Sequence, residues 1–148
     1  MYCPADAGYT YILSIFPRYI SVYVGLSITV NCPGDAGYKY IPSIPLCYKL
    51  YNEGLSWSSA KSRCESDGGR LFQGDTPHKI TWAFHNIKVT GGVWIGGDDK
   101  DVEGEWKWED DTPVVDPLWR DGEPSNTFNQ DCLLIGDDRL WDLTFAER

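Results

Sequence analysis

Between Trp119 and Leu143 the sequence crowds together side chains that could bind a cation, in the stretch "WRDGEPSNTFNQDCLLIGDDRLWDL". Carboxylate and amide oxygens are ligands that calcium prefers, and it takes about 6–8 oxygens in all. Yet Ser125, Gln130 and Leu143 stand where a charged or amide ligand would serve better. From the residues alone, three interpretations are open: a working metal site, a site that has lost ligands, or a turn-rich acidic surface loop.

The composition limits the ligands that this stretch could bind. The chain has 148 residues, 42% of them hydrophobic and 14% aromatic, which is enough for one domain with a real core. Its formal net charge of −9 argues against nucleic acid, because phosphate binding needs clustered Lys and Arg. That charge is compatible with cations and with neutral polar ligands such as sugars. No nucleophile motif and no distinct catalytic carboxylate pair occur, so we do not expect an enzyme.

Two helices and several short strands must position the loop. Ser56 and Thr76 are suitable N-caps, and apolar residues follow each of them at helical spacing. We expect helices that begin at these residues and end at the glycine pairs 68–69 and 91–92. Short apolar or alternating runs predict strands at 47–53, 93–97, 103–110, 131–136 and 139–145. Their tryptophans, including Trp94, Trp106, Trp108 and Trp141, are expected in the core. This order of elements predicts an α+β fold.

The N-terminal part of the chain contains a repeat. "CPADAGYTYILSI" begins at Cys3, and "CPGDAGYKYIPSI" begins at Cys32. Only the second copy can close a local disulfide, to Cys47, and such a loop stabilises by roughly 3 kcal/mol. We place a domain boundary near Asn31, so that residues 1–31 form an extension with a partial duplicate of the domain start. The apolar segment 19–30 is predicted to be one buried or edge strand rather than a signal remnant.

The cysteines indicate an oxidising compartment. Five cysteines are an odd number, so at least one lacks a partner within the chain. Cys3 is the one that we expect to be unpaired, because the first copy has no cysteine at the place of Cys47. Without CxxC pairs or a cluster of cysteines and histidines, disulfides are favoured over a zinc site.

Taken in order, the motifs resemble those of a C-type lectin-like domain. They read "CYKL…WSSAKSRC…GGRL…WIGG…GEWKWED…GEPS…NQDC…LWDL", and the resemblance covers residues 32–148. It implies a double-loop fold with two helices and small antiparallel sheets. It also implies a Cys32–Cys47 bridge, as in the family's long form, and a calcium and sugar site in the long loop.

Two departures from the family pattern concern cysteines. In the family, the cysteine matching Cys64 bonds to one on a last strand, and the cysteine matching Cys132 bonds to one shortly after the W-N-D motif. The sequence ends at Arg148 before either partner appears. We therefore expect residues 32–148 to be a C-terminally incomplete domain in which Cys64 and Cys132 lack these bridges. The absent strand predicts an exposed sheet edge, and failure to fold stably is a further alternative.

The resemblance also assigns site residues, because the family's main calcium ligands bind sugar hydroxyls directly. The carbohydrate-binding residues implied are Glu123, Ser125, Gln130 and Asp142. Of these, Glu123, Ser125 and Asp142 are implied metal ligands, and an auxiliary cation site maps to Asp99, Glu103, Asn126, Gln130 and Asp131. Ser125 and Gln130 replace stronger ligands and Leu143 offers none, so we expect calcium binding to be weak or lost.

These residues predict an extracellular, secreted lectin-like recognition domain. Its expected partner is a glycan or glycoprotein, bound through the long loop with weakened or absent calcium dependence. The alternative is a calcium-independent module that binds a protein or mineral surface through its acidic face. No membrane span is expected, because a span takes roughly 20 apolar residues.

Overall fold

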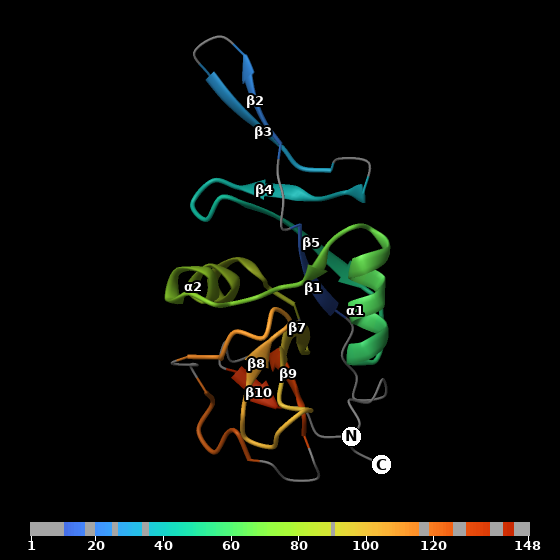
Figure 1. The fold of residues 1–148 in the computed structure, drawn as a ribbon, viewed down its shortest axis with the longest axis vertical. Helices are drawn as coiled ribbons and strands as arrows, with labels where there is room; N and C mark the ends of the chain where they lie inside the picture. Colours follow the sequence, from blue (N-terminus) through green and yellow to red (C-terminus); the bar gives the residue numbers. More distant parts are fainter. Residues whose placement is uncertain are drawn as a thin grey trace.

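The structure is a computed structural model. It describes residues 11–16, 20–24, 27–33, 36–89, 91–115, 119–125, 130–136 and 141–143. Within these ranges two helices accompany one mixed sheet, and a hairpin stands beyond that sheet at the top of the view (Figure 1). The predicted α+β class with two helices is confirmed.

The elements follow one another in the order expected, with additional strands at the N-terminal end. The helices are α1 (Trp57–Ser66) and α2 (Pro77–Asn86). The strands are β1 (Tyr11–Phe16), β2 (Ile20–Val24), β3 (Ser27–Asn31), β4 (Lys39–Ile41), β5 (Leu46–Asn52), β6 (Arg70–Leu71), β7 (Val93–Asp98), β8 (Lys107–Trp108), β9 (Cys132–Ile135) and β10 (Trp141–Leu143).

Both helices begin where the capping residues predicted. The Ser56 side chain accepts a hydrogen bond from the backbone N–H of Ser59, at 3.3 Å, which satisfies one of the unpaired donors of the first turn. Thr76 does the same for α2, and Pro77 occupies its first turn. The end of α2 differs from the prediction: Ile87 is already extended, so the helix ends before the 91–92 glycine pair.

β1 lies in the middle of the main sheet, whose order is β10-β9-β7-β1-β5-β4. It pairs antiparallel with β5 along its whole length, from Tyr11↔Asn52 to Phe16↔Cys47. On its other side it pairs with β6 and, in parallel, with β7 at Ile12↔Trp94. A strand therefore fills the place between β5 and β7, and the exposed edge that we expected is not present there.

Residues 11–16 are part of the main sheet, and the boundary near Asn31 stays a prediction. The N-terminal segment differs from the prediction in the number of its strands. The segment 19–30 contains two strands, β2 and β3, instead of one. These two pair antiparallel with each other, from Ile20↔Asn31 to Val24↔Ser27, and form a separate two-stranded sheet.

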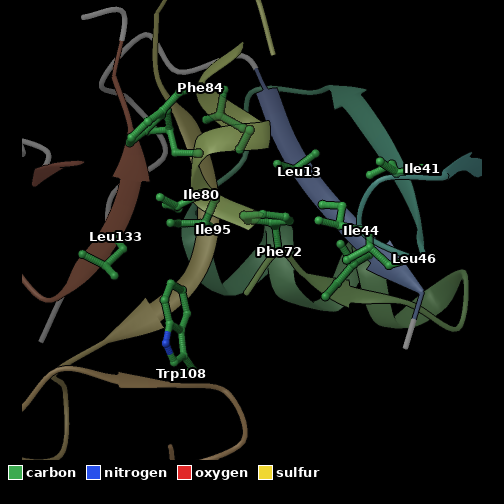
Figure 2. Close-up of a cluster of buried hydrophobic side chains, with 14 of the residues drawn as sticks. Leu13, Ile41, Ile44, Leu46, Phe72, Ile80, Phe84, Ile95, Trp108 and Leu133 are labelled. Carbon is green, nitrogen blue, oxygen red and sulfur yellow. The ribbon is translucent and has the colours of Figure 1, made fainter. Parts of the chain in front are cut away.

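Two hydrophobic clusters form the core, and β1 contributes to both. Leu13 and Ile15 belong to the larger cluster and Ile12 to the smaller. Figure 2 shows the larger one, with Leu13 of β1 among side chains from other elements, including Phe72 and Ile95. The expected tryptophan core is confirmed for Trp94, Trp106 and Trp108, which are buried. The Trp141 side chain lies outside the description.

The cysteines partly follow the predictions. The Cys32–Cys47 disulfide is present, with its Cα atoms 5.6 Å apart. Cys132 is also disulfide-bonded, whereas we had expected only that it lacks the bridge typical of the family. Cys64 is free and buried on α1. Cys3, which we expected to be unpaired, lies outside the described residues.

An ion-pair network joins the C-terminal end of α1 to β5. Asp67 accepts hydrogen bonds from Lys49 Nζ at 2.9 Å and from the Tyr51 hydroxyl at 2.7 Å, and it pairs with Arg63 at 3.1 Å. The hydrogen bonds from Lys49 and Tyr51 hold the pKa of the Asp67 carboxyl well below its usual range. Burial raises the pKa of Tyr51, so its hydroxyl stays a donor at neutral pH.

Candidate functional site

The candidate site is built on the adjacent ends of β7 and β9. These strands pair antiparallel, and Asp98 lies opposite Cys132. The next residues outward, Asp99 and Asp131, are therefore neighbours, and the Asp99 N–H donates to the Asp131 carbonyl oxygen at 3.2 Å. The strands approach closely because residue 97 is glycine: a Cβ there would lie 2.2 Å from Leu133 Cδ1.

The structure brings together three of the predicted auxiliary residues, Asp99, Glu103 and Asp131. Asp99 and Asp131 are each only 3% exposed. Burial, together with the negative charges of Glu103 and Asp131, raises the pKa of Asp99 to about 6. A buried carboxylate close to other carboxylates is costly to ionise. Asn126, the fourth residue assigned only to this site, lies outside the described residues.

One oxygen of Asp99 is held and the other is not. Oδ2 accepts a hydrogen bond from the Gly104 N–H at 2.9 Å, whereas Oδ1 is buried and has no hydrogen-bond partner. Gly104 has a φ of +80°, a conformation that glycine adopts readily, and this turns the loop back toward Asp99. We did not predict a role for Gly104, although its place directly after the acidic residue Glu103 was a usable signal for a turn.

Three of the four predicted carbohydrate-binding residues are linked in a chain of hydrogen bonds. The Ser125 backbone N–H donates to Glu123 Oε2 at 2.8 Å, and the Ser125 hydroxyl donates to Gln130 Oε1 at 2.7 Å. Gln130 is 4% exposed, and its Nε2 is buried without a hydrogen-bond partner. The peptide bond between Glu123 and Pro124 is cis.

The fourth residue, Asp142, is placed by its backbone only. It lies on β10 opposite Leu134 of β9, in the same sheet as the other site residues. Its side chain lies outside the description, and so does that of Leu143. The structure thus brings Glu123, Ser125 and Gln130 together and places Asp142 on the adjoining strand.

Tryptophans support the loop. The rings of Trp106 and Trp119 pack edge to face, with centroids 5.4 Å apart. Trp106 is 8% exposed and belongs to the larger core cluster, with Trp119 packed against that cluster. Trp119 therefore holds the start of the loop on the core.

The chemistry of the two residue groups differs. The hydrogen-bonded group offers one carboxylate, Glu123, and one buried amide donor, Gln130 Nε2, so it suits hydroxyl groups better than a divalent cation. The group around Asp99 offers three carboxylates and suits a cation in its donor types. In the described part of the chain, however, no set of three or more His, Cys, Asp or Glu converges closely enough to hold a metal ion. Nor does any helix there have the length and apolarity to cross a membrane.

Comparisons with known proteins point to one family. The model of the lectin C-type domain matches residues 53–147. C-type lectin domain family 4 member E of Mus musculus is 36% identical over 94 residues, which cover 62% of this chain and 44% of the relative. The chain thus spans less than half the length of that relative.

Two solved structures resemble the fold at comparable identity. One is the cow C-type carbohydrate-recognition domain of CD23 in the presence of a GlcNAc2Man3 oligosaccharide, with a TM-score of 0.55 and 30% identity, covering 60% of this chain and 69% of that one. The other is a calcium-independent type II antifreeze protein, with a TM-score of 0.51 and 31% identity, covering 58% of this chain and 66% of that one. Because the domain model matches most of the length of this chain, the chain belongs to the C-type lectin domain family.

Proposed function

We propose that the chain is an extracellular glycan-recognition domain whose loop between Trp119 and Leu143 binds sugar hydroxyls with weakened or absent calcium dependence. The observation that carries the proposal is the hydrogen-bonded chain of Glu123, Ser125 and Gln130. These residues lie close together within this loop, and they present an acceptor and a donor together.

The weak calcium dependence follows from what these side chains already bind. The Gln130 carbonyl oxygen, which could serve a cation, accepts the Ser125 hydroxyl instead. Its amide nitrogen is a donor and repels a cation. Glu123 is then the one anionic ligand among the described side chains of this group, and a cage short of anions binds calcium weakly.

A sugar can be bound by the same groups without a metal. Hydroxyl groups both donate and accept, so one hydroxyl could accept from Gln130 Nε2 while another donates to Glu123. A buried donor without a partner is costly, on the order of 1–3 kcal/mol, and a ligand that supplies the missing acceptor recovers that cost. The oligosaccharide present with the cow CD23 domain supports a glycan as the ligand class.

Cation binding, where it occurs, is better served by the group around Asp99. Asp99, Glu103 and Asp131 would have to move closer together to hold an ion, and a bound cation would then offset the cost of their clustered negative charge. The unpartnered Asp99 Oδ1 is consistent with a ligand role. The cation would then order the 99–105 loop next to the sugar-binding group.

The second candidate is calcium-independent binding of a protein or mineral surface. The likeness to a calcium-independent antifreeze protein favours it, as does the net charge of −9. A net charge attracts oppositely charged partners but discriminates little among them. Binding through an acidic face would be lost at high salt, whereas hydrogen bonding to a sugar would persist.

A glycan array probed with calcium and with EDTA tests the proposal. We expect glycan binding that persists in EDTA and is lost in the Gln130→Ala variant. Asp121→Asn, a change at an exposed position of the same loop, is the control and should bind as the wild type does. Gln130→Glu adds a carboxylate and should increase the calcium dependence. If no glycan binds while adsorption to a protein or mineral surface persists in Gln130→Ala, the second candidate replaces the first.

A further inference from the structure

The repeat in the sequence has a structural counterpart that sugar binding does not explain. The first copy contains β1, and the second copy contains β4. Both strands pair antiparallel with β5, one on each of its edges. Two segments of nearly the same sequence thus recognise the same strand, in different registers: Ile15 and Lys39 both lie opposite Tyr48.

The place of β1 must be filled for the domain to fold. Ile12, Leu13 and Ser14 have no exposed surface, and Ile15 is 3% exposed. Removing the strand would open both core clusters at once, leave β5 without a neighbour on that edge and remove the pairing partner of Val93 and Trp94 on β7. Because burial of large aliphatic side chains is a main source of folding stability, the domain needs a strand in this place.

The hairpin that follows β1 makes no strand pairing with the main sheet in the described residues. It lies between β1 and Cys32, which is bonded to Cys47 of β5, and its two strands pair with each other. Figure 1 shows the hairpin standing away from the two helices. A second copy of the chain could therefore supply β1 through the same contacts, without breaking any other pairing of the sheet.

The hairpin itself favours a second copy. An isolated two-stranded hairpin is at best marginally stable in water. From Ile20 to Asn31 the sequence has no Asp, Glu, Lys or Arg, the residues that normally discourage pairing along a strand edge. When two chains exchange a terminal strand, their connecting segments meet near the two-fold axis. We propose that two copies of this chain exchange β1 and that their β2–β3 hairpins pair edge to edge in the resulting dimer.

The free thiol of Cys64 offers a direct test in the full-length chain. Ser14 of β1 and Cys64 of α1 are both fully buried, and these two elements contact each other, so Ser14→Cys would bring a second thiol close to that of Cys64. After refolding and mild oxidation, exchange predicts a covalent dimer on a non-reducing denaturing gel, in a proportion that rises with protein concentration. If the disulfide forms but the protein migrates only as a monomer at every concentration, the exchange is overturned. The exchange is also overturned if no disulfide forms between these two positions.

Two control variants identify the thiols involved. Ser14→Cys with Cys64→Ser should give no covalent dimer, and a dimer that persists there arises from other cysteines and overturns the assignment. Ser43→Cys changes the matching serine of the second copy, which is exposed, and should also give none.

A further pair of measurements does not depend on the added thiol. Wild-type chains with two different tags, refolded together, should co-purify, whereas chains that never form mixed dimers contradict the proposal. Val30→Lys places a charge on β3 and should raise the dissociation constant of the dimer, and so lower the dimer fraction; a tenfold higher dissociation constant is the equivalent of ~1.4 kcal/mol. An unchanged dimer fraction in this variant would exclude pairing through the hairpin.

Discussion

Substituting Glu109 by glutamine should stabilise the protein at neutral and basic pH. Glu109 follows β8, and its Oε1 is buried without a hydrogen-bond partner. Burial raises the pKa of this carboxyl from 4.5 to about 7, although Lys61 and Arg70 act in the opposite direction. The folded protein therefore prefers Glu109 protonated, whereas the unfolded chain ionises it more readily.

The magnitude follows from the difference between these two pKa values. Each pKa unit corresponds to about 1.4 kcal/mol, so full ionisation in the folded state costs on the order of 3 kcal/mol. Because the folded pKa is raised, the contribution is fully present below pH 4.5 and is lost as the pH rises through about 7. Glutamine has the same shape and no charge to bury, so the variant avoids this loss.

Urea unfolding followed by tryptophan fluorescence, at about pH 5 and about pH 8, measures the effect. The gain in unfolding free energy of Glu109→Gln over wild type should be larger at the higher pH, by up to about 3 kcal/mol. Other titrating groups are shared by both proteins and cancel in the comparison. Glu105→Gln, at an exposed position nearby, is the control and should show no such difference. Equal effects of Glu109→Gln at both pH values would refute the reasoning.

Three more changes should have measurable results. Asp67→Asn removes the ion pair with Lys49 and should cost about 1–2 kcal/mol near pH 7, with less loss below pH 3.8, because the depressed pKa stabilises only where the carboxyl is ionised. Urea midpoints at pH 3 and 7 check this, and a constant loss would contradict it. Asp99→Asn should raise the melting temperature near pH 7 in the absence of calcium, and it should abolish any increase that added calcium gives the wild type. Calorimetry with and without calcium measures both effects. If calcium raises the melting temperature of the variant as much as that of the wild type, Asp99 is not a ligand. Gly97→Ala should destabilise by about 1–3 kcal/mol, because its Cβ would meet Leu133, and Leu133→Ala in the same chain should recover part of that loss; if the second change only adds to the first, the contact is not the cause.

The candidate site shows how far residue types alone can lead. The sequence identified Glu123, Ser125 and Gln130 through their motif, and the structure places them within hydrogen-bonding distance of one another. The sequence could not reveal that the Ser125 hydroxyl donates a hydrogen bond to the Gln130 side-chain carbonyl oxygen. That depends on how the loop folds between these two residues, which the residue types at this spacing do not determine.

Local features of the fold were predictable for a physical reason. A helix start depends on residues within one turn, so Ser56 and Thr76 were sufficient to locate both helices. The second repeat copy closes a loop of short sequence separation, so the Cys32–Cys47 disulfide was also within reach of the sequence.

Long-range pairing was decided by the tertiary structure. The two repeat copies have nearly the same residues, yet one becomes the buried strand β1 and the other the edge strand β4. A strand's partners depend on which edges elsewhere in the fold are unfilled, and this is a property of the assembled sheet rather than of the segment itself. The sequence by itself therefore determined the family, the helices and the loop that carries the site. The tertiary structure alone decided that the N-terminal copy closes the sheet between β5 and β7.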